Sequence, residues 1–105
     1  MASAILAQSN PTAITNTTVY TVPASNYAIM NISIANRATT AITVRVAVAA
    51  AAAPTTSEWI EYDTTIPGNG VLERTGVATP AGKLIVVYVS AANASVSVYG
   101  ILQAV

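Results

Sequence analysis

The sequence predicts an all-β protein: a single antiparallel β-sandwich of about eight strands, with either jelly-roll or immunoglobulin-like architecture. Two observations carry this prediction. Apolar and polar residues alternate along most of the chain, and helical periodicity is nearly absent. Turn signals rich in Gly, Pro and Asn separate the alternating segments. The length of 105 residues suits one hydrophobic core, so we expect residues 1–105 to form one domain.

The N-terminal part holds two extended segments. Residues 3–8 (SAILAQ) fit either a short strand or part of an extended N-terminal arm over residues 1–16. Pro11 then interrupts the pattern. Residues 18–22 (TVYTV) are β-branched and aromatic, which favours a strand that ends before Pro23.

Two strongly alternating segments, residues 27–36 and 41–49, flank a polar turn with the sequence NRATT. Each has one apolar face, so we expect both to be strands with that face in the core. The inward residues would be Met30, Ile32, Ile34, Ile42, Val44, Val46 and Val48. Because the connection is short, we expect these two strands to pair as a hairpin, with Arg45 facing outward.

The alanine run at residues 49–53 is closed by a proline. Alanine favours helix, but five residues are too few for a stable one, so we expect a strand end that passes into a loop with room for one helical turn. Residues 58–63 (EWIEYD) form the next expected strand, followed by a turn with the sequence TIPGNG. Gly68 and Gly70 are expected to supply positive φ angles in that turn.

Three strands are expected in the last third of the chain. Residues 71–77 (VLERTGV) form a short one. Residues 83–90 (KLIVVYVS) are apolar on both faces, which indicates a central strand or one covered by a partner. Residues 94–103 (ASVSVYGILQ) alternate again, with Val96 and Val98 inward.

The segment EWIEYD holds three of the four acidic residues of the chain. Strand alternation places Trp59, Glu61 and Asp63 on the outer face and puts Ile60 and Tyr62 in the core. Two outer carboxylates about 7 Å apart would suit an inverting glycosidase. Such an enzyme also needs a cleft, a carboxyl with a raised pKa and aromatic sugar platforms, which a small sandwich with one tryptophan hardly offers.

Other chemistries find little support in the residue types. The chain has no histidine and no cysteine, and the acidic residues are not spaced as in a calcium-binding loop. We therefore predict no catalytic residue, metal site or cofactor, and interpret the acids as members of an ionic ladder with arginines within or between subunits. The interface candidates are Arg45, Trp59, Glu61, Asp63, Glu73 and Arg74.

The composition favours association with protein rather than with nucleic acid or membrane. Hydrophobic residues make up 53% of the chain, charged residues 8%, and the net charge is zero. No basic stripe is present to bind phosphates, and the longest apolar run is too short to span a bilayer. The N-terminus lacks the features of a signal peptide, so we expect synthesis in the cytoplasm. A surface this poor in charge would associate, which predicts a homo-oligomer.

Three stretches resemble a known group of proteins: TVYTVPASNYAIMNISIANRATTAITVRVAV, EWIEYDTTIPGNGVLERTG and AGKLIVVYVSAANASVSVYG. Together they look like small β-rich virion structural proteins of tailed phages, especially phages of marine bacteria and cyanobacteria. The resemblance covers roughly residues 17–100 and is moderately specific. Trp59 stands where the pattern has tyrosine, and the alanine run is longer than in the pattern.

The resemblance implies a structural component of the virion and no enzymatic activity. The expected role is a capsid cement or decoration protein on the capsid surface, made in the host cytoplasm. It would bridge subunits of the phage major capsid protein at local threefold positions, which favours a homotrimer. The alternative is a tail, baseplate or head-fibre component with a role in host adhesion.

Overall fold

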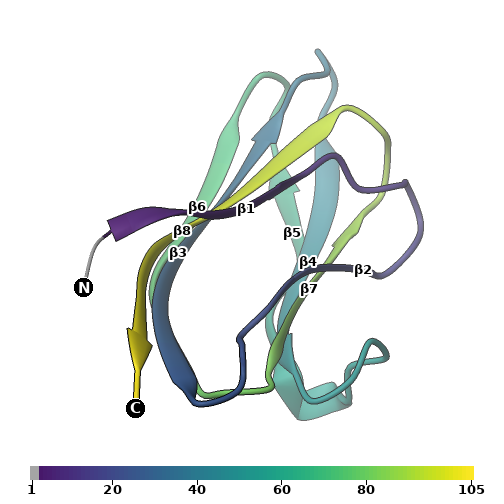
Figure 1. Ribbon diagram of the computed structural model, residues 1–105. Coiled ribbons are helices and arrows are strands. Elements are labelled where there is room, and N and C mark those ends of the chain that lie inside the picture. The colour runs from purple at the N-terminus through teal and green to yellow at the C-terminus, as the bar shows by residue number, and fades with distance from the viewer. Residues whose placement is uncertain (1–2) are drawn as a thin grey trace.

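The computed structural model describes residues 3–105, which form eight β-strands and one short 3-10 helix (Figure 1). The elements are β1 (Ser3–Ser9), β2 (Thr17–Thr21), β3 (Asn26–Asn36), β4 (Ile42–Ala49), η1 (Thr56–Glu58), β5 (Trp59–Ile66), β6 (Val71–Thr79), β7 (Leu84–Val89) and β8 (Ala94–Ala104). Among these residues, no helix has the length and apolar character needed to cross a membrane.

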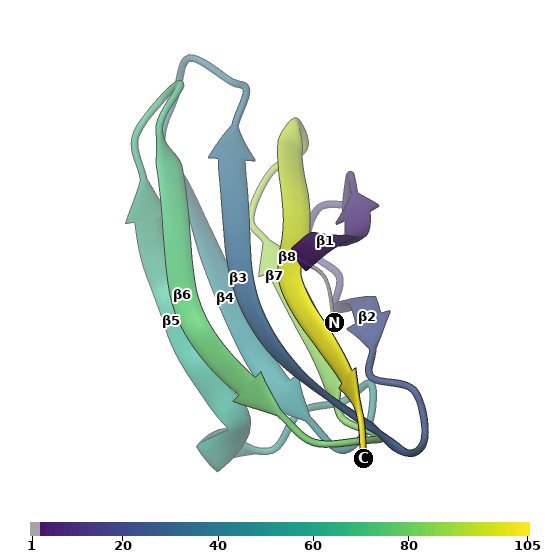
Figure 2. The ribbon, with the colours of Figure 1, turned by 60° about the vertical axis from the view of Figure 1, so that its left-hand side comes forward.

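The strands form two four-stranded antiparallel sheets that pack against each other, as Figure 2 shows. We call the sheet with the order β1-β8-β3-β6 sheet A and the sheet with the order β2-β7-β4-β5 sheet B. The strand pairs β1–β8, β2–β7, β3–β6 and β4–β5 are nested, so the first four strands pair with the last four in reverse order. This order is that of a jelly roll, and the predicted all-β sandwich is confirmed.

The main core lies between the sheets and is built from the apolar faces that the sequence predicts. The inward residues of β3 and β4 are buried, except that Val48 is only partly buried against the same cluster. Val96 and Val98 of β8 are buried as expected. Strand β7 lies between β2 and β4, which confirms its central position, and it contributes Ile85, Val87 and Val89 to the core.

The predicted hairpin between the third and fourth strands is wrong, because β3 belongs to sheet A and β4 to sheet B. Residues 37–41 form an arch from one sheet to the other. The buried side chain of Asn36 supports this arch: its Nδ2 donates to the carbonyls of Thr40 (2.8 Å) and Pro67 (3.2 Å), and its Oδ1 accepts from the N–H of Ala38. These bonds take the place of the strand-to-strand bonds that a hairpin would form.

Of the two conformations expected near the N-terminus, a short strand and an extended arm, the structure shows the strand. Residues Ser3–Ser9 form β1 at the edge of sheet A, paired with β8, and Leu6 and Ala7 pack against the core. Pro11 is also buried. The first two residues of the expected arm lie outside the described residues.

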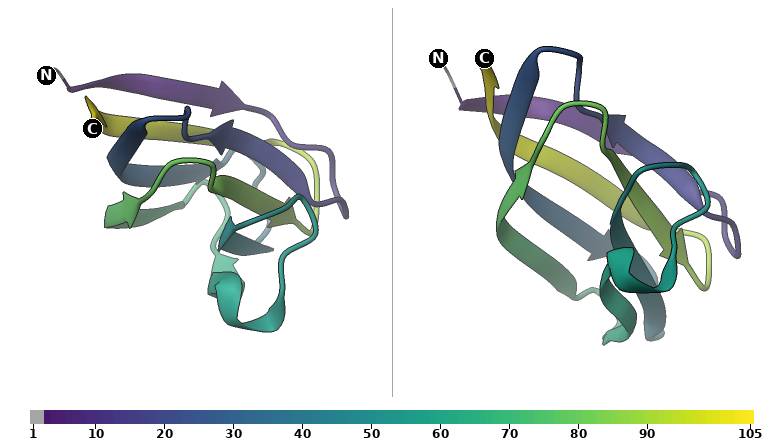
Figure 3. Two further views of the ribbon diagram at one scale, coloured as in Figure 1. Left: turned by 60° about the horizontal axis from the view of Figure 1, so that its bottom comes forward. Right: turned by 90° about the horizontal axis from the view of Figure 1, so that it is seen from below.

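The alanine run is a loop, as expected, and the helical turn follows it. Strand β4 ends at Ala49, and η1 lies directly before β5. Glu58 belongs to this turn and not to the strand: its carboxylate accepts N–H groups from Thr55 at 2.8 Å and from Ala50 at 3.0 Å. These two bonds lower the pKa of Glu58. Figure 3 shows the connection between β4 and β5 on the sheet B side of the molecule.

In the turn between β5 and β6, the residue with a positive φ is Asn69 (58°), not Gly68 or Gly70 as predicted. Gly68 is required for a different reason. A Cβ at this position would lie 2.1 Å from the carbonyl oxygen of Thr39 in the β3–β4 arch. The two loops therefore touch at a point where no side chain fits.

Candidate functional site

Strand β5 is irregular, and this irregularity shapes the candidate site. In its pairing with β4, Thr64 lies opposite Val44 and Glu61 opposite Val46, so β5 holds an extra residue between the two pairs. A second register shift separates Glu61 from Trp59. Such bulges break the regular alternation of side chains and re-aim individual residues. Asp63, beside the first bulge, has a φ of 51°.

The bulges overturn one part of the predicted orientation. Ile60 packs against the main core, as expected. Tyr62, predicted to share that core position, instead points outward and is 56% exposed. Strand alternation alone could not reveal this, because no residue in EWIEYD marks an inserted position.

Arg45 and Asp63 form an ion pair between neighbouring strands β4 and β5. Arg45 Nε lies 2.6 Å from Asp63 Oδ1, and Nη2 lies 3.3 Å from Oδ2. The guanidinium also lies over two rings, 4.2 Å from the centroid of Tyr62 and 4.6 Å from that of Tyr88. The hydrogen bond to Asp63 raises the pKa of Arg45. The ion pair predicted for Arg45 is formed within one chain, and the guanidinium makes cation–π contacts with both aromatic rings.

Arg74 and Glu61 form the second pair, at 2.7 Å. Arg74 is on β6 in sheet A and Glu61 is on β5 in sheet B, so this pair ties the edges of the two sheets together. The other oxygen of Glu61 accepts the hydroxyl of Thr64 at 2.8 Å. Both oxygens of this half-buried carboxylate are thus occupied by groups of its own chain.

Glu73 does not join the ionic ladder. It lies opposite Ser33 on the outer face of sheet A, and its Oε2 accepts the hydroxyl of Tyr99. This bond raises the pKa of Tyr99. The predicted candidates are therefore divided between the β5 region and a different face of the molecule.

Trp59 covers part of the outer face of sheet B. It packs with Leu84 on a small apolar cluster formed by Ala47, Ala49 and Val86. Its ring meets that of Tyr62 edge-on, with centroids 5.6 Å apart and an interplanar angle of 73°. Thr56, Trp59 and Tyr62 line a small hollow of about 310 Å³.

The β5 region offers fixed polar and aromatic groups for contact with a partner. Trp, Tyr and Arg are the residue types that most often carry binding energy at protein interfaces. Asp63 and Glu61 each have an arginine partner. Glu61, predicted to lie on the outer face, is opposite the buried Val46 and pairs with Arg74 at the edge between the two sheets. Within residues 3–105, no three acidic, histidine or cysteine side chains gather as a metal site would need.

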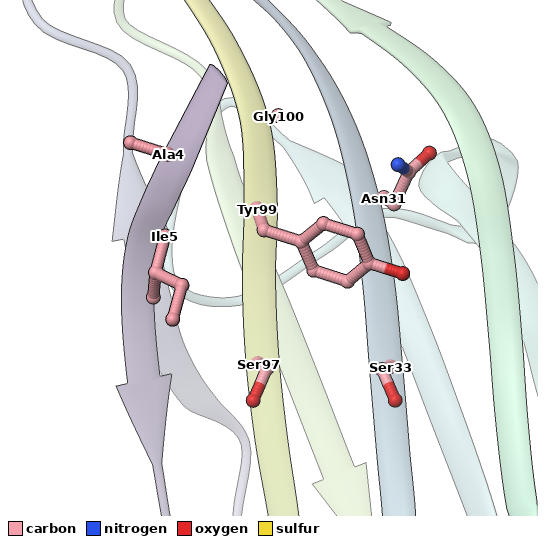
Figure 4. Close-up of a pocket in the computed structure, with 7 residues that line it drawn as sticks. All are labelled: Ala4, Ile5, Asn31, Ser33, Ser97, Tyr99 and Gly100. Atoms are coloured by element: carbon pink, nitrogen blue, oxygen red, sulfur yellow. The ribbon is translucent and has the colours of Figure 1, made fainter.

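The sequence reasoning missed a second surface, the outer face of sheet A. A shallow hollow of about 650 Å³ lies over β1, β3 and β8 (Figure 4). The residues that line it are Ala4, Ile5, Asn31, Ser33, Ser97, Tyr99 and Gly100. A signal was present: Tyr27 and Ile29 are apolar, although alternation places them on the side of β3 that faces away from the core.

Comparisons of the chain with protein-family models, with curated proteins and with solved structures find no match.

Proposed function

We propose that this protein is a virion structural component of a tailed phage, and specifically a capsid cement or decoration protein that stabilises the head by bridging major capsid subunits. The resemblance of roughly residues 17–100 to such virion proteins motivates the proposal. The structural observation that carries it is the outer face of sheet A, which exposes Ile5, Tyr27, Ile29 and Val71. Exposed apolar surface of this kind is typical of contact with other proteins.

A cement protein acts by binding and needs neither an enzymatic activity nor a cofactor. A protein that binds the assembled shell and not the separate subunits shifts the equilibrium toward the shell. A small domain with little charge suits this role, because it covers neutral surface on several subunits at once. The protein would be made in the host cytoplasm and lie on the capsid surface, where local threefold positions favour a homotrimer.

The charged residues of β5 would set the orientation of binding. Glu61 and Asp63 are already paired with Arg74 and Arg45, so these groups are held in fixed positions. In a surface with few charges, each fixed charge disfavours partners that present the wrong sign. This role requires no change in the chain on binding.

The test is the copy number and heat stability of particles. Quantitative mass spectrometry of virions should find the protein in hundreds of copies, a rough figure set by the number of sites on an icosahedral shell. Particles made without it should lose their DNA at lower temperature, and added purified protein should restore the loss. A handful of copies per virion would exclude the cement role.

A tail, baseplate or head-fibre component with a role in host adhesion is the second candidate. The hollow beside Tyr62 and Trp59 favours it, because an exposed aromatic ring with a neighbouring hydroxyl is a common arrangement for binding sugars. This role predicts few copies per virion. It also predicts that Tyr62→Ala abolishes attachment to host cells while the heat stability of particles stays unchanged.

A further inference from the structure

The two outer faces of the sandwich differ in how far the chain covers them. On sheet B, Trp59 covers the apolar cluster at Ala47 and Val86. On sheet A, four large apolar side chains remain exposed. They are Ile5 (63%), Tyr27 (39%), Ile29 (45%) and Val71 (60%). Four of the seven large apolar residues exposed in the described part of the chain therefore lie on one face.

These side chains form part of a continuous surface across the sheet. Pairing places Ile29 beside Ile101, Ser33 beside Ser97, and Ala35 beside Val71. The row between those of Ile29 and Ser33 holds Asn31, Tyr99 and Ile5 side by side on β3, β8 and β1. These residues are apolar or carry neutral polar groups. The face also holds the exposed carboxylate of Glu73, opposite Ser33 on the edge strand β6, so a partner that covers the face has to leave this carboxylate at the rim in contact with water.

The two charged residues of β6 in this region each have a partner within the chain. Glu73 accepts the hydroxyl of Tyr99 on the same face. Arg74 lies opposite the buried Ile32, so it is directed toward the space between the sheets, where it reaches Glu61. A charged or strongly polar partner would gain little from this face and would lose its own hydration.

We propose that the outer face of sheet A is a dimer interface of the free protein, covered by the same face of a second copy around a two-fold axis. A largely apolar face can pack against its own copy with Glu73 left at the rim, and a two-fold interface is the arrangement in which one surface meets its own copy. Face-to-face packing of sheets is also how this molecule builds its own core. The inference concerns the free protein. Since the cement role is argued from the same face, binding to a capsid would replace the contact between the two copies.

The size of the face is sufficient for such a dimer. Four strands about 4.8 Å apart, with about 3.3 Å per residue along strands of up to 11 residues, give a footprint of about 600 Å². A standard interface buries about 800 Å² of accessible surface per partner, and accessible surface exceeds a flat footprint because side chains project from it. The face therefore has to be covered almost completely, which a matching sheet does and a narrow peptide does not.

The test is the solution mass of the purified chain, measured by sedimentation velocity and by light scattering over a range of concentrations. We expect a species of twice 10.7 kDa at high concentration. Ile29→Lys, on the inner strand β3 of the face, should convert it to a monomer. Ile14→Lys makes the same change at an exposed residue (71%) in the β1–β2 connection and should leave the dimer intact.

Further readouts separate the alternatives. Ser97→Lys, on the inner strand β8 of the same face, adds a charge without removing an apolar group. It should also give a folded monomer if Ile29→Lys folds poorly. High salt should leave the dimer unchanged or strengthen it, because the face holds no ion pair with the partner. A monomer at every concentration, a trimer, or a dimer that persists in both Ile29→Lys and Ser97→Lys would overturn the inference. The cement role is tested separately, by copy number and heat stability of virions. A trimer in solution would overturn the dimer while agreeing with the homotrimer expected for the cement role.

Discussion

Arg45 and Asp63 meet through two contacts across β4 and β5, and the backbone of Asp63 adopts a left-handed conformation (φ 51°) at that point. The bulge beside Asp63 also turns Tyr62 outward, where its ring lies under the Arg45 guanidinium. A non-glycine residue with positive φ is unfavourable unless its surroundings hold it. The ion pair and the stacked ring are the contacts that hold Asp63 here.

At position 63 we therefore expect Asn to be tolerated better than Ala. Both substitutions remove the ion pair, but Asn adopts the left-handed region more readily than Ala. Asp63→Ala should reduce the free energy of unfolding by about 1 kcal/mol more than Asp63→Asn, measured by urea denaturation. At the neighbouring Thr65, which is not among the residues with positive φ, Asn should have no such advantage. Equal stability of the two variants at 63 would mean that this backbone conformation is not maintained in solution.

The core of the fold could be predicted because its signal is local. Met30, Ile32 and Ile34 alternate with small or polar residues, and they are buried as this pattern requires. The pairing of β3 with β6 and β8 could not be predicted, because a five-residue connection fits an arch as well as a hairpin. Only contacts distant in sequence, such as Asn36 with Pro67, decide between the two.

The ion pairs of the candidate site could be predicted from the sequence, whereas the orientation of its aromatic residue Tyr62 could not. The scarcity of charge left Arg45 and Arg74 as the natural partners of the β5 acids, and both pairs form. The place of Tyr62 depends on the bulges in β5, which arise from pairing with β4 and leave no mark in the sequence. The separation of Glu73 follows from its position on the outward side of β6, opposite Ser33.

Asn36 should be among the most sensitive polar positions. It is 2% exposed, and its Nδ2 points at the carbonyls of Thr40, Ile66 and Pro67. Asn36→Asp replaces this donor with a carboxylate that only accepts, so we expect a loss of about 3 kcal/mol or more in the free energy of unfolding at neutral pH. The loss should shrink as the pH falls, because a protonated carboxyl can donate one hydrogen bond.

Asn26→Asp is the matched control for this substitution. The amide of Asn26 donates to a single carbonyl, that of Ala24, in an exposed hydrogen bond. Its replacement should change stability by less than about 1 kcal/mol, as is usual for surface positions. If the two Asp variants are equally stable, Asn36 does not join the loops as described.

Gly68 and Gly76 should respond differently to the same substitutions. A Cβ at Gly68 would collide with the backbone of Thr39, whereas a Cβ at Gly76 meets nothing within 4 Å but would sit on a residue with a φ of 68°. Gly68→Ala should cost about 2–3 kcal/mol through forced separation of the two loops. Gly76→Ala should cost about 1 kcal/mol through its backbone conformation alone.

Asn substitutions distinguish these two causes. Gly76→Asn should recover most of the stability lost in Gly76→Ala, because Asn tolerates positive φ. Gly68→Asn should be at least as unstable as Gly68→Ala, since its side chain is larger. Thermal unfolding of the four variants checks this, and recovery at Gly68 would refute the steric explanation.

Glu58 should give the protein a stability that depends on pH. Its pKa is lowered below the ordinary value of 4.5 by the N–H groups of Thr55 and Ala50. A group whose pKa is lower in the folded state stabilises the fold above its unfolded pKa, and this contribution disappears as the pH falls through the folded pKa. Glu58→Gln should therefore lower the melting temperature at pH 7, and its curve should approach that of the wild type below pH 4.5. Parallel curves over this range would contradict the role given to Glu58.

Thr79 offers a substitution that should stabilise the protein. It is 2% exposed, and its Oγ1 is buried without a hydrogen-bond partner within residues 3–105. Because a buried polar atom without a partner is unfavourable, Thr79→Val should raise the free energy of unfolding by about 1 kcal/mol while keeping the shape of the side chain. Thr64→Val is the matched control, since the Thr64 hydroxyl donates to Glu61 at 2.8 Å and its loss should destabilise the β5 edge. If both valine variants are less stable than the wild type in urea denaturation, the Thr79 hydroxyl has a partner in solution and the expected gain does not exist.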